Sequence, residues 1–238
     1  EHDRRIKSPA ELACLRQAGR ITSGAIAASF EALAEGVTTA ELTAVMLASA
    51  IRAGSDRMGT LPYVSSGPRT YRAHASWSDD PIAAGEVVNA EMAASVRYYH
   101  VPLFRVFSVG EPSSEIRRMH DASEAGLHAG LETIRAGMTS HEADQIVRAA
   151  IEKTGLGEAF VVRAAYGIGT AFAPGWGETP VMSIRPRDQR VLEAGMCFHL
   201  VPALYREGVG CVCCSMPLVI TETGVERLSN LEPKLFVR

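Results

Sequence analysis

Residues 30–41 read FEALAEGVTTAE and residues 131–142 read LETIRAGMTSHE, and these two stretches decide the fold. In each, an amphipathic helix ends at a glycine, Gly36 or Gly137, the residue best suited to a helix C-terminus. A threonine or serine then begins the next helix, with a glutamate close behind it as in a capping box. The copies lie about 101 residues apart, and the same spacing separates two later helix stops, Gly54 and Gly155. The chain is therefore predicted to contain an internal duplication.

Strand-like segments follow both copies. Residues 85–91 read GEVVNAE and residues 195–201 read GMCFHLV, each after an Ala-Gly turn. Two helices and then strands, twice over, predict a duplicated α+β fold in a single domain of residues 1–238, with halves of about 1–112 and 113–238. The predicted helices lie near 8–34, 39–53, 113–135 and 139–154, and the predicted strands near 60–66, 85–94, 96–109, 160–166, 195–205 and 209–221.

The composition excludes several classes of protein. The 238 residues are 47% hydrophobic, which is enough for one sizeable core. A net charge of -3 without a basic run argues against nucleic acid and anionic membranes as partners. No apolar stretch approaches the roughly 18 residues of a transmembrane helix, and the opening EHDRR lacks the apolar core of a signal peptide. Five cysteines without a disulfide pattern fit a reducing compartment, so we expect a cytoplasmic protein.

Four motifs carry a resemblance to a known family. They are RIKSPAEL at residues 5–12, the strand at 99–110 that ends in Val-Gly, AGMCF at 194–198 and VITETGVERL at 219–228. Together they resemble the pita-bread (creatinase and aminopeptidase, M24) superfamily over essentially the whole chain. The N-terminal domain that usually precedes this fold is absent from the sequence. The resemblance implies a duplicated pita-bread fold and, by analogy, a homodimer.

The metallopeptidases of that superfamily bind two metal ions through two Asp, one His and two Glu side chains. The resemblance places Glu91, Pro102, Tyr166, Val201 and Ser215 at these five positions. Hard divalent cations require several oxygen ligands, and this set offers one carboxylate. We therefore expect no metal and no other cofactor.

Other segments resemble the metal-independent branch, which includes creatinase and ectoine hydrolase. These are HASWSDD at 74–80, YHVPL at 99–103, YGIGTAFAPGWGE at 166–178 and Phe198-His199. The ectoine hydrolase pattern carries acids on the late strand, where this chain has Cys213 and Met216. A buried cationic substrate without carboxylates is costly, so the substrate is expected to be less cationic than ectoine, or Glu91 and Glu178 suffice to bind it.

Five residues are predicted to be catalytic. Glu91 lies in an apolar strand, where a buried acid is costly unless it is used or paired, and it is the predicted base or nucleophile. His74, His100 and His199 are predicted to bind substrate and shuttle protons, because imidazole titrates near neutral pH. Tyr166 is predicted to donate a hydrogen bond to a substrate oxygen. The alternatives are an outward-facing glutamate, structural histidines and a tyrosine that merely ends a strand.

Five further residues are predicted to bind substrate. Trp77 and Trp176 suit a stacking wall, and Arg105 suits a substrate carboxylate or a structural ion pair. Glu178 is either a substrate anchor or a solvated loop acid, and Cys213 is either a pocket wall or a buried structural thiol. No fourth ligand stands at zinc-finger spacing from the cysteine cluster, which argues against a zinc site. The remaining histidines are expected at the surface: His2, His120, His128 and His141.

The sequence thus predicts a metal-independent hydrolase that cleaves a C–N bond in a small cyclic or amidine-like metabolite. Two alternatives stay open. One is an Xaa-Pro aminopeptidase-like metallopeptidase, and the other is a small-molecule binding module that has lost its chemistry.

Overall fold

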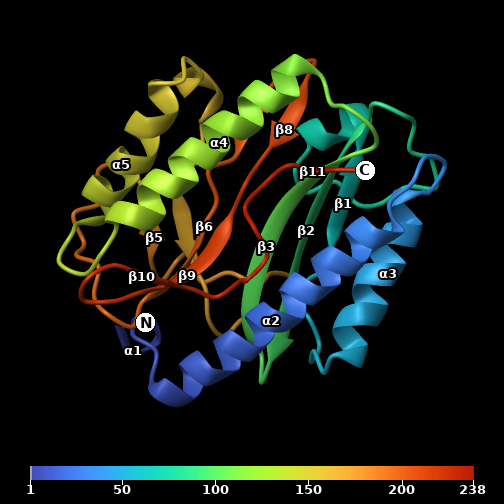
Figure 1. Cartoon of the computed structure of the whole chain (residues 1–238). Helices are drawn as coiled ribbons and strands as arrows, with labels where there is room; N and C mark the ends of the chain where they lie inside the picture. Colours follow the sequence, from blue (N-terminus) through green and yellow to red (C-terminus); the bar gives the residue numbers. More distant parts are fainter. Residues whose placement is uncertain (1) are drawn as a thin grey trace.

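The computed structural model describes residues 2–238, so the first residue of the predicted domain lies outside the described residues. Two pairs of helices cover the strands, one pair from each half of the chain (Figure 1). They are α2 (Pro9–Ala32) with α3 (Thr39–Arg52), and α4 (Ser114–Thr133) with α5 (Ser140–Glu152). All four predicted helices are confirmed. The short α1 (His2–Arg5) was not predicted.

The duplication is visible in matching backbone contacts. Gly36 N–H donates to the Ile82 carbonyl at 2.8 Å, and Gly137 N–H donates to the Leu192 carbonyl at 2.9 Å. The two glycines have φ of +85° and +88°, a region that disfavours a side chain. The same turn is thus built twice, as the repeat predicts, but the two glycines are not helix caps: α2 ends at Ala32 and α4 at Thr133, and Gly36 and Gly137 lie in the turns that follow.

The strands form two main sheets. The first has the order β1-β2-β3-β11 and the second β10-β9-β6-β4-β5, with a separate β7-β8 hairpin. The bounds in the first sheet are β1 (Tyr63–Ser66), β2 (Val87–Val96), β3 (Tyr99–Ser108) and β11 (Phe236–Val237). The others are β4 (Ala165–Gly167), β5 (Ser183–Ile184), β6 (Cys197–Leu200), β7 (Leu204–Arg206), β8 (Gly210–Val212), β9 (Met216–Ile220) and β10 (Val225–Arg227). Single 3-10 turns occupy Gly67–Tyr71 and Gly157–Ala159.

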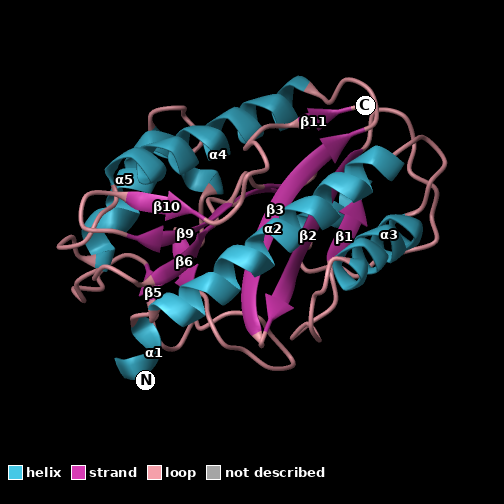
Figure 2. Ribbon diagram, turned by 60° about the horizontal axis from the view of Figure 1, so that its bottom comes forward, coloured by secondary structure: helices cyan, strands magenta, loops and turns pink. Residues whose placement is uncertain are grey.

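Each helix pair packs on its own sheet. Helix α2 lies across β2 and β3, and the view of Figure 2 shows α2 and α3 covering the face of this sheet. Their apolar sides meet strand residues such as Met92, Leu103 and Phe107 in one core cluster. A second cluster under α4 and α5 contains Val147, Phe198 and Leu218. Helices on one face of each sheet leave the inner ends of the strands free to shape a site.

The predicted strands of the second half are longer than the observed ones. The segment predicted at 195–205 ends as a strand at Leu200. Pro202, two residues on, has no N–H for a further ladder bond. The segment predicted at 209–221 is divided into β8 and β9, and the one near 160–166 begins only at Ala165. Strands β5, β10 and β11 were missed because each has only two or three residues.

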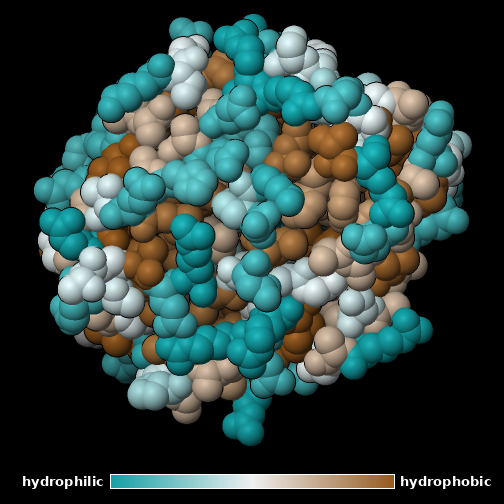
Figure 3. All heavy atoms as spheres, viewed as in Figure 1, coloured by the Kyte–Doolittle hydropathy of each residue, from teal (hydrophilic) through white to brown (hydrophobic). Residues whose placement is uncertain are grey.

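Within the described residues, no helix combines the length and the apolarity that crossing a membrane would take. On the face seen in Figure 3, hydrophobic residues are divided by hydrophilic ones rather than joined into one band.

Candidate functional site

A cavity of about 390 Å³ lies where the two halves meet. Strands β1, β2 and β3 of the first half contribute to its wall, and so do β4, β7 and the loop after β4 in the second half. Its lining includes Tyr63, His74, Glu91, Phe104, Arg163, Tyr166, Trp176, Thr179, Val201 and Tyr205. Of the ten predicted site residues, Glu91, His74, Tyr166 and Trp176 therefore line one cavity.

Glu91 is the carboxylate of this cavity. Strand β2 is buried along nearly its whole length, so its side chains are enclosed on both faces, and Glu91 is only 4% exposed. Burial raises the pKa of Glu91 from the ordinary 4.5 to about 8, because a carboxylate loses hydration there. The prediction of a buried rather than outward-facing acid agrees with this placement.

Two imidazoles face the Glu91 carboxylate from different sides. His199 Nδ1 lies 4.0 Å from Glu91 Oε1, and His74 Nε2 lies 3.9 Å from Glu91 Oε2. These separations exceed a hydrogen bond, so neither ring holds the carboxylate in place. They leave the acid close to two imidazoles, of which His74 lines the cavity and His199 does not.

His199 is held by a hydrogen-bond network behind the cavity wall. Its Nδ1 lies 2.8 Å from the Tyr166 hydroxyl and its Nε2 lies 2.7 Å from Ser215 Oγ. Trp176 Nε1–H donates to the Tyr166 oxygen at 2.8 Å, and Phe104 N–H donates to Ser215 Oγ at 2.9 Å. Ser215 Oγ also lies 3.4 Å from the Phe104 carbonyl oxygen, to which its O–H donates, so His199 Nε2–H donates to Ser215 and His199 Nδ1 accepts from the Tyr166 O–H. This assignment of the neutral tautomer follows from the network.

Its surroundings keep His199 uncharged. Burial and the nearby cations Arg105 and Arg163 lower its pKa from 6.5 to about 3. The premise that His199 titrates near neutral pH is therefore corrected. Burial likewise raises the pKa of Tyr166 well above 10, so its phenol keeps its proton.

His74 lies at the mouth of the cavity, with its side chain 70% exposed. Its ring stacks on Tyr63 with centroids 4.5 Å apart, which fixes its orientation toward Glu91. Partial burial, followed by the nearby Arg163, lowers its pKa below 6.5. His74 is thus a largely neutral imidazole that reaches both solvent and the buried acid.

His100 does not join the site. Its Nε2 accepts from Gly59 N–H at 2.9 Å, and its Nδ1 lies 2.8 Å from the Tyr98 carbonyl oxygen. The ring is fully buried and both nitrogens are occupied by backbone groups. This corrects the prediction of a catalytic His100 and favours the structural alternative.

Arg105 is also structural in this fold. Its guanidinium donates to the carbonyl oxygens of Phe104, Ser215, Leu231 and Glu232 at 2.7–3.0 Å, and the residue is fully buried. These four bonds tie β3 to the β9 end and to the C-terminal segment. No donor is directed at the cavity, which corrects the predicted substrate role.

Glu178 pairs inward with the N-terminal segment. Its Oε1 lies 2.9 Å from Arg4 Nη2 and its Oε2 lies 2.8 Å from Lys7 Nζ. Glu178 is 3% exposed, and its neighbours Gly177 and Thr179 line the cavity while it does not. Glu178 is therefore neither a substrate anchor nor a solvated acid. It fixes α1 against the loop after β4.

Trp77 and Cys213 also lie outside the cavity wall. Trp77 is 37% exposed, and Cys213 is fully buried beside Cys211 and Cys214. Burial raises the pKa of Cys213 well above 9, so the thiol is protonated and inert. The structure thus corrects the predicted roles of both residues in the pocket wall.

Several cavity residues were missed by the sequence analysis. Arg163 and Thr179 belong to irregular segments, and Tyr63 and Tyr205 lie in short strands. Ser215 was noted only as a lost ligand, yet it holds His199. No local pattern marks these residues, because contacts between segments far apart in the sequence bring them together.

The five positions that hold metals in the metallopeptidases do not fit a dinuclear centre in this chain. Glu91 supplies the one carboxylate, and Pro102 and Val201 offer no donor side chain. The phenol of Tyr166 and the hydroxyl of Ser215 are both engaged with His199. Two hard cations need several anionic oxygens, and this set supplies one.

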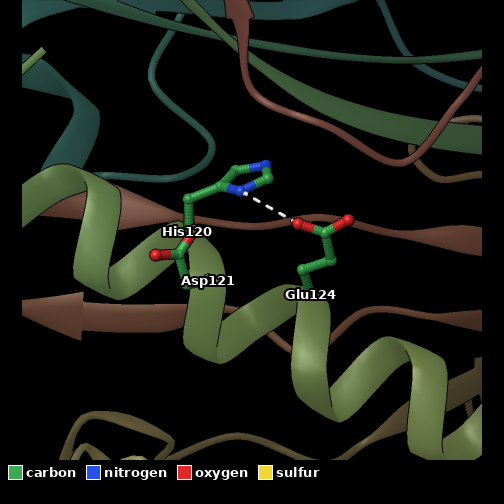
Figure 4. A group of neighbouring side chains, drawn as sticks. All are labelled: His120, Asp121 and Glu124. Carbon is green, nitrogen blue, oxygen red and sulfur yellow. Dashed lines mark ion pairs between the residues drawn. The ribbon is translucent and has the colours of Figure 1, made fainter.

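A second cluster of candidate ligands lies on α4, where His120, Asp121 and Glu124 place donor atoms within 4.8 Å of one another. His120 is 2% exposed, which corrects its predicted surface position, whereas His128 and His141 are partly exposed and the side chain of His2 lies outside the described residues. Figure 4 shows Nδ1 of His120 facing Glu124, at 3.8 Å, while its other ring nitrogen points away. Neighbouring acids on one helix are common, and we assign this cluster no function.

Comparisons with known proteins agree with this architecture. Residues 13–222 match the model of metallopeptidase family M24. The chain is 32% identical to ectoine hydrolase of Halomonas elongata over 99% of its own length and 60% of that protein, and 28% identical to an Xaa-Pro dipeptidase of Pyrococcus furiosus over 97% and 64%. It superposes on an X-Pro aminopeptidase from Thermotoga maritima with a TM-score of 0.91 at 26% identity, covering 100% of this chain and 66% of that one. The chain therefore spans less than two thirds of these curated relatives, and the predicted pita-bread α+β fold is confirmed. It belongs to metallopeptidase family M24.

Proposed function

We propose that this protein hydrolyses a C–N bond in a small cyclic or amidine-like metabolite without a metal ion. The observation that carries the proposal is the single buried carboxylate of Glu91 in the wall of a 390 Å³ cavity. A carboxylate of raised pKa that faces two imidazoles is typical of acid–base or nucleophilic catalysis.

The reaction adds one water molecule across the C–N bond. In its ionised form, Glu91 either removes a proton from the attacking water or attacks the carbon itself, and water then releases the product. A C–O bond forms, the C–N bond breaks, and the leaving nitrogen takes up a proton. His74 is suited to relay that proton, taking it from protonated Glu91 or from solvent, because it reaches both.

His199 and Tyr166 are better suited to hold the site than to move protons. The neutral ring of His199 is fixed through Tyr166 and Ser215, and the phenol of Tyr166 already donates to that ring. Their network supports Glu91 from behind and leaves His74 as the mobile proton carrier. Trp176, which lines the cavity and anchors Tyr166, supplies an apolar wall for the substrate.

The similarity to ectoine hydrolase supports this class of substrate, and the donor set supports a metal-free mechanism. The similarity to an Xaa-Pro dipeptidase keeps a metallopeptidase as the second candidate. That alternative predicts activity on a proline dipeptide that disappears on chelation. The predicted cytoplasmic location, the small-molecule substrate and the homodimer are parts of the same proposal.

The test is incubation of chelator-treated protein with ectoine, creatine and an Xaa-Pro dipeptide, followed by mass spectrometry. Water added to ectoine or creatine, lost in Glu91→Gln and retained in the exposed-residue control Glu35→Gln, supports the proposal. Hydrolysis that appears only after zinc or manganese is restored would overturn it. Retention of cellular function by Glu91→Gln would favour the binding module.

A further inference from the structure

The charge of the cavity wall points to a feature of the substrate. Among the described lining residues, three carry titratable groups other than phenols: His74, Glu91 and Arg163. Burial raises the pKa of Glu91 to about 8 and lowers that of His74, so both are mainly neutral at pH 7. Arg163 contributes a guanidinium cation. The cavity wall by itself therefore carries an excess positive charge.

The guanidinium of Arg163 has few partners among the described residues. Its Nε is buried without a hydrogen-bond partner. Its Nη2 lies 3.4 Å from Thr179 Oγ1, a long contact on the rim, and its central carbon lies 5.2 Å over the Tyr166 ring. The ring positions the cation but offers no acceptor for its N–H groups.

Arg148 shows how a structural arginine is bound in this fold, and two of its partners lie just before Arg163 in the sequence. It donates to both carboxylate oxygens of Asp144 and to the carbonyls of Phe160 and Val162. A structural arginine in this fold thus has its donors satisfied. Arg163 lacks such acceptors, although buried donors are normally paired.

We propose that Arg163 binds a carboxylate of the substrate, with Thr179 beside it, while the scissile C–N bond faces Glu91. A planar carboxylate is a strong acceptor for a guanidinium, and Nη2 beside Thr179 is the donor that lies at the rim of the cavity. This inference rests on the proposed function and narrows it: the substrate is a small nitrogen-containing acid rather than a bare cation or a neutral amide.

The proposal also accounts for the lost late-strand acids. A zwitterionic substrate brings its own negative charge, so Cys213 and Met216 need not be carboxylates. Arg163 offsets that charge, and Glu91 faces the nitrogen end. A cationic nitrogen beside Glu91 favours the ionised carboxylate, so the two charges of the substrate are each paired and the occupied site is nearly neutral, which limits the cost of burying charge.

Binding is the direct test, because it does not require turnover. Calorimetric titration would use three pairs of ligands: ectoine and its carboxamide, N-acetylglycine and N-acetylglycinamide, and acetate and acetamide. The proteins are wild type, Arg163→Gln, Arg163→Lys and the exposed-residue control Arg20→Gln. Each is examined alone and with Glu91→Gln, and thermal melting checks that each is folded.

At least one acid should bind wild type and Arg20→Gln about tenfold more tightly than its amide, the value of one charge-assisted bond. Arg163→Gln should abolish that preference and Arg163→Lys should keep part of it. Equal binding or no binding of acid and amide in every pair, or a preference that survives Arg163→Gln, would overturn the carboxylate site. If the preference holds but no substrate is hydrolysed, the proposed reaction fails while the anion site stands.

Discussion

The two halves of the duplication share one order of helices and strands, but they contribute different residues to the cavity. In the first half, β2 and β3 pair over ten residues each, with Glu91 opposite Phe104. In the second half, β6 pairs with β9 over only four residues. Counting from the matching glycines Gly85 and Gly195, Glu91 and Val201 occupy equivalent positions, and both line the cavity.

The difference shows how a duplicated fold acquires an asymmetric site. The unbroken strand of the first half buries a carboxylate on a rigid frame, which raises its pKa. The strand of the second half ends at Leu200, and Val201 N–H turns to the Ala164 carbonyl at 2.8 Å. Because its strand is short, the second half places loops and the Tyr166–His199 network beside Glu91. One half supplies the buried acid, and the other supplies much of its surroundings.

Substitutions at the two equivalent positions, made one at a time, should give the strongest contrast in activity. Glu91→Gln should lower kcat/KM for the substrate by about 1,000-fold, because it removes the base or nucleophile. Val201→Ala, the matched change in the other half, should lower it by less than about tenfold. Steady-state kinetics on both variants tests the contrast. Comparable losses in the two variants would mean that the halves contribute equally and that Glu91 has no special role.

The same acid should make the protein less stable at neutral pH. The pKa of Glu91 is about 8 in the folded protein, against 4.5 for a free side chain. Above pH 4.5 the unfolded chain releases the proton and the folded chain keeps it, so stability falls until pH reaches about 8. Glu91→Gln removes this loss and should stabilise the protein by about 3 kcal/mol at pH 7.

Urea unfolding of wild type and Glu91→Gln at pH 5 and pH 7 measures that difference. The gain should shrink to less than about 1 kcal/mol at pH 5, because that pH is only about half a unit above the pKa of the unfolded side chain. An equal gain in the free energy of unfolding at both pH values would show that the effect comes from packing and not from the titration of Glu91.

The pH dependence of the rate sharpens the assignment of the reactive group. If ionised Glu91 acts on the substrate, kcat/KM should rise about tenfold per pH unit up to about pH 8 and then level off. His199, with a pKa of about 3, should contribute no step near neutrality. A plateau that already begins near pH 5 would be inconsistent with Glu91 as the base.

The sequence predicts correctly those features that depend on residues close together in the chain. The repeated glycine and cap motifs predict both helix pairs, and an acid in an apolar strand predicts buried Glu91. It failed for His100 and Arg105, which are fully buried in the same strand as apolar residues. What decides their roles is the partner: Gly59 for His100 and the carbonyls near the C-terminus for Arg105.

Arg163 illustrates the opposite case, a site residue with no signal in the sequence. It precedes a three-residue strand in an irregular segment, and many surface arginines look the same. Only the unsatisfied donors and the position in the cavity wall distinguish it. Tertiary contacts determine which polar residues of this fold carry chemistry, whereas local patterns determine the elements that hold them.

The smallest expected effect concerns the features that the halves still share. Thr38 and Thr139 each accept a hydrogen bond at 3.1 Å from the backbone of a glutamate three residues on, Glu41 and Glu142. Since both caps have the same geometry, Thr38→Ala and Thr139→Ala should each lower the Tm by about 2–4 °C. Calorimetric scans of the two variants, with Thr→Ser at each site as a control that keeps the cap, measure the shifts. If one cap proves several times more costly to lose, the halves differ in stability even at their matched helix starts, and the asymmetry of this domain extends beyond the cavity.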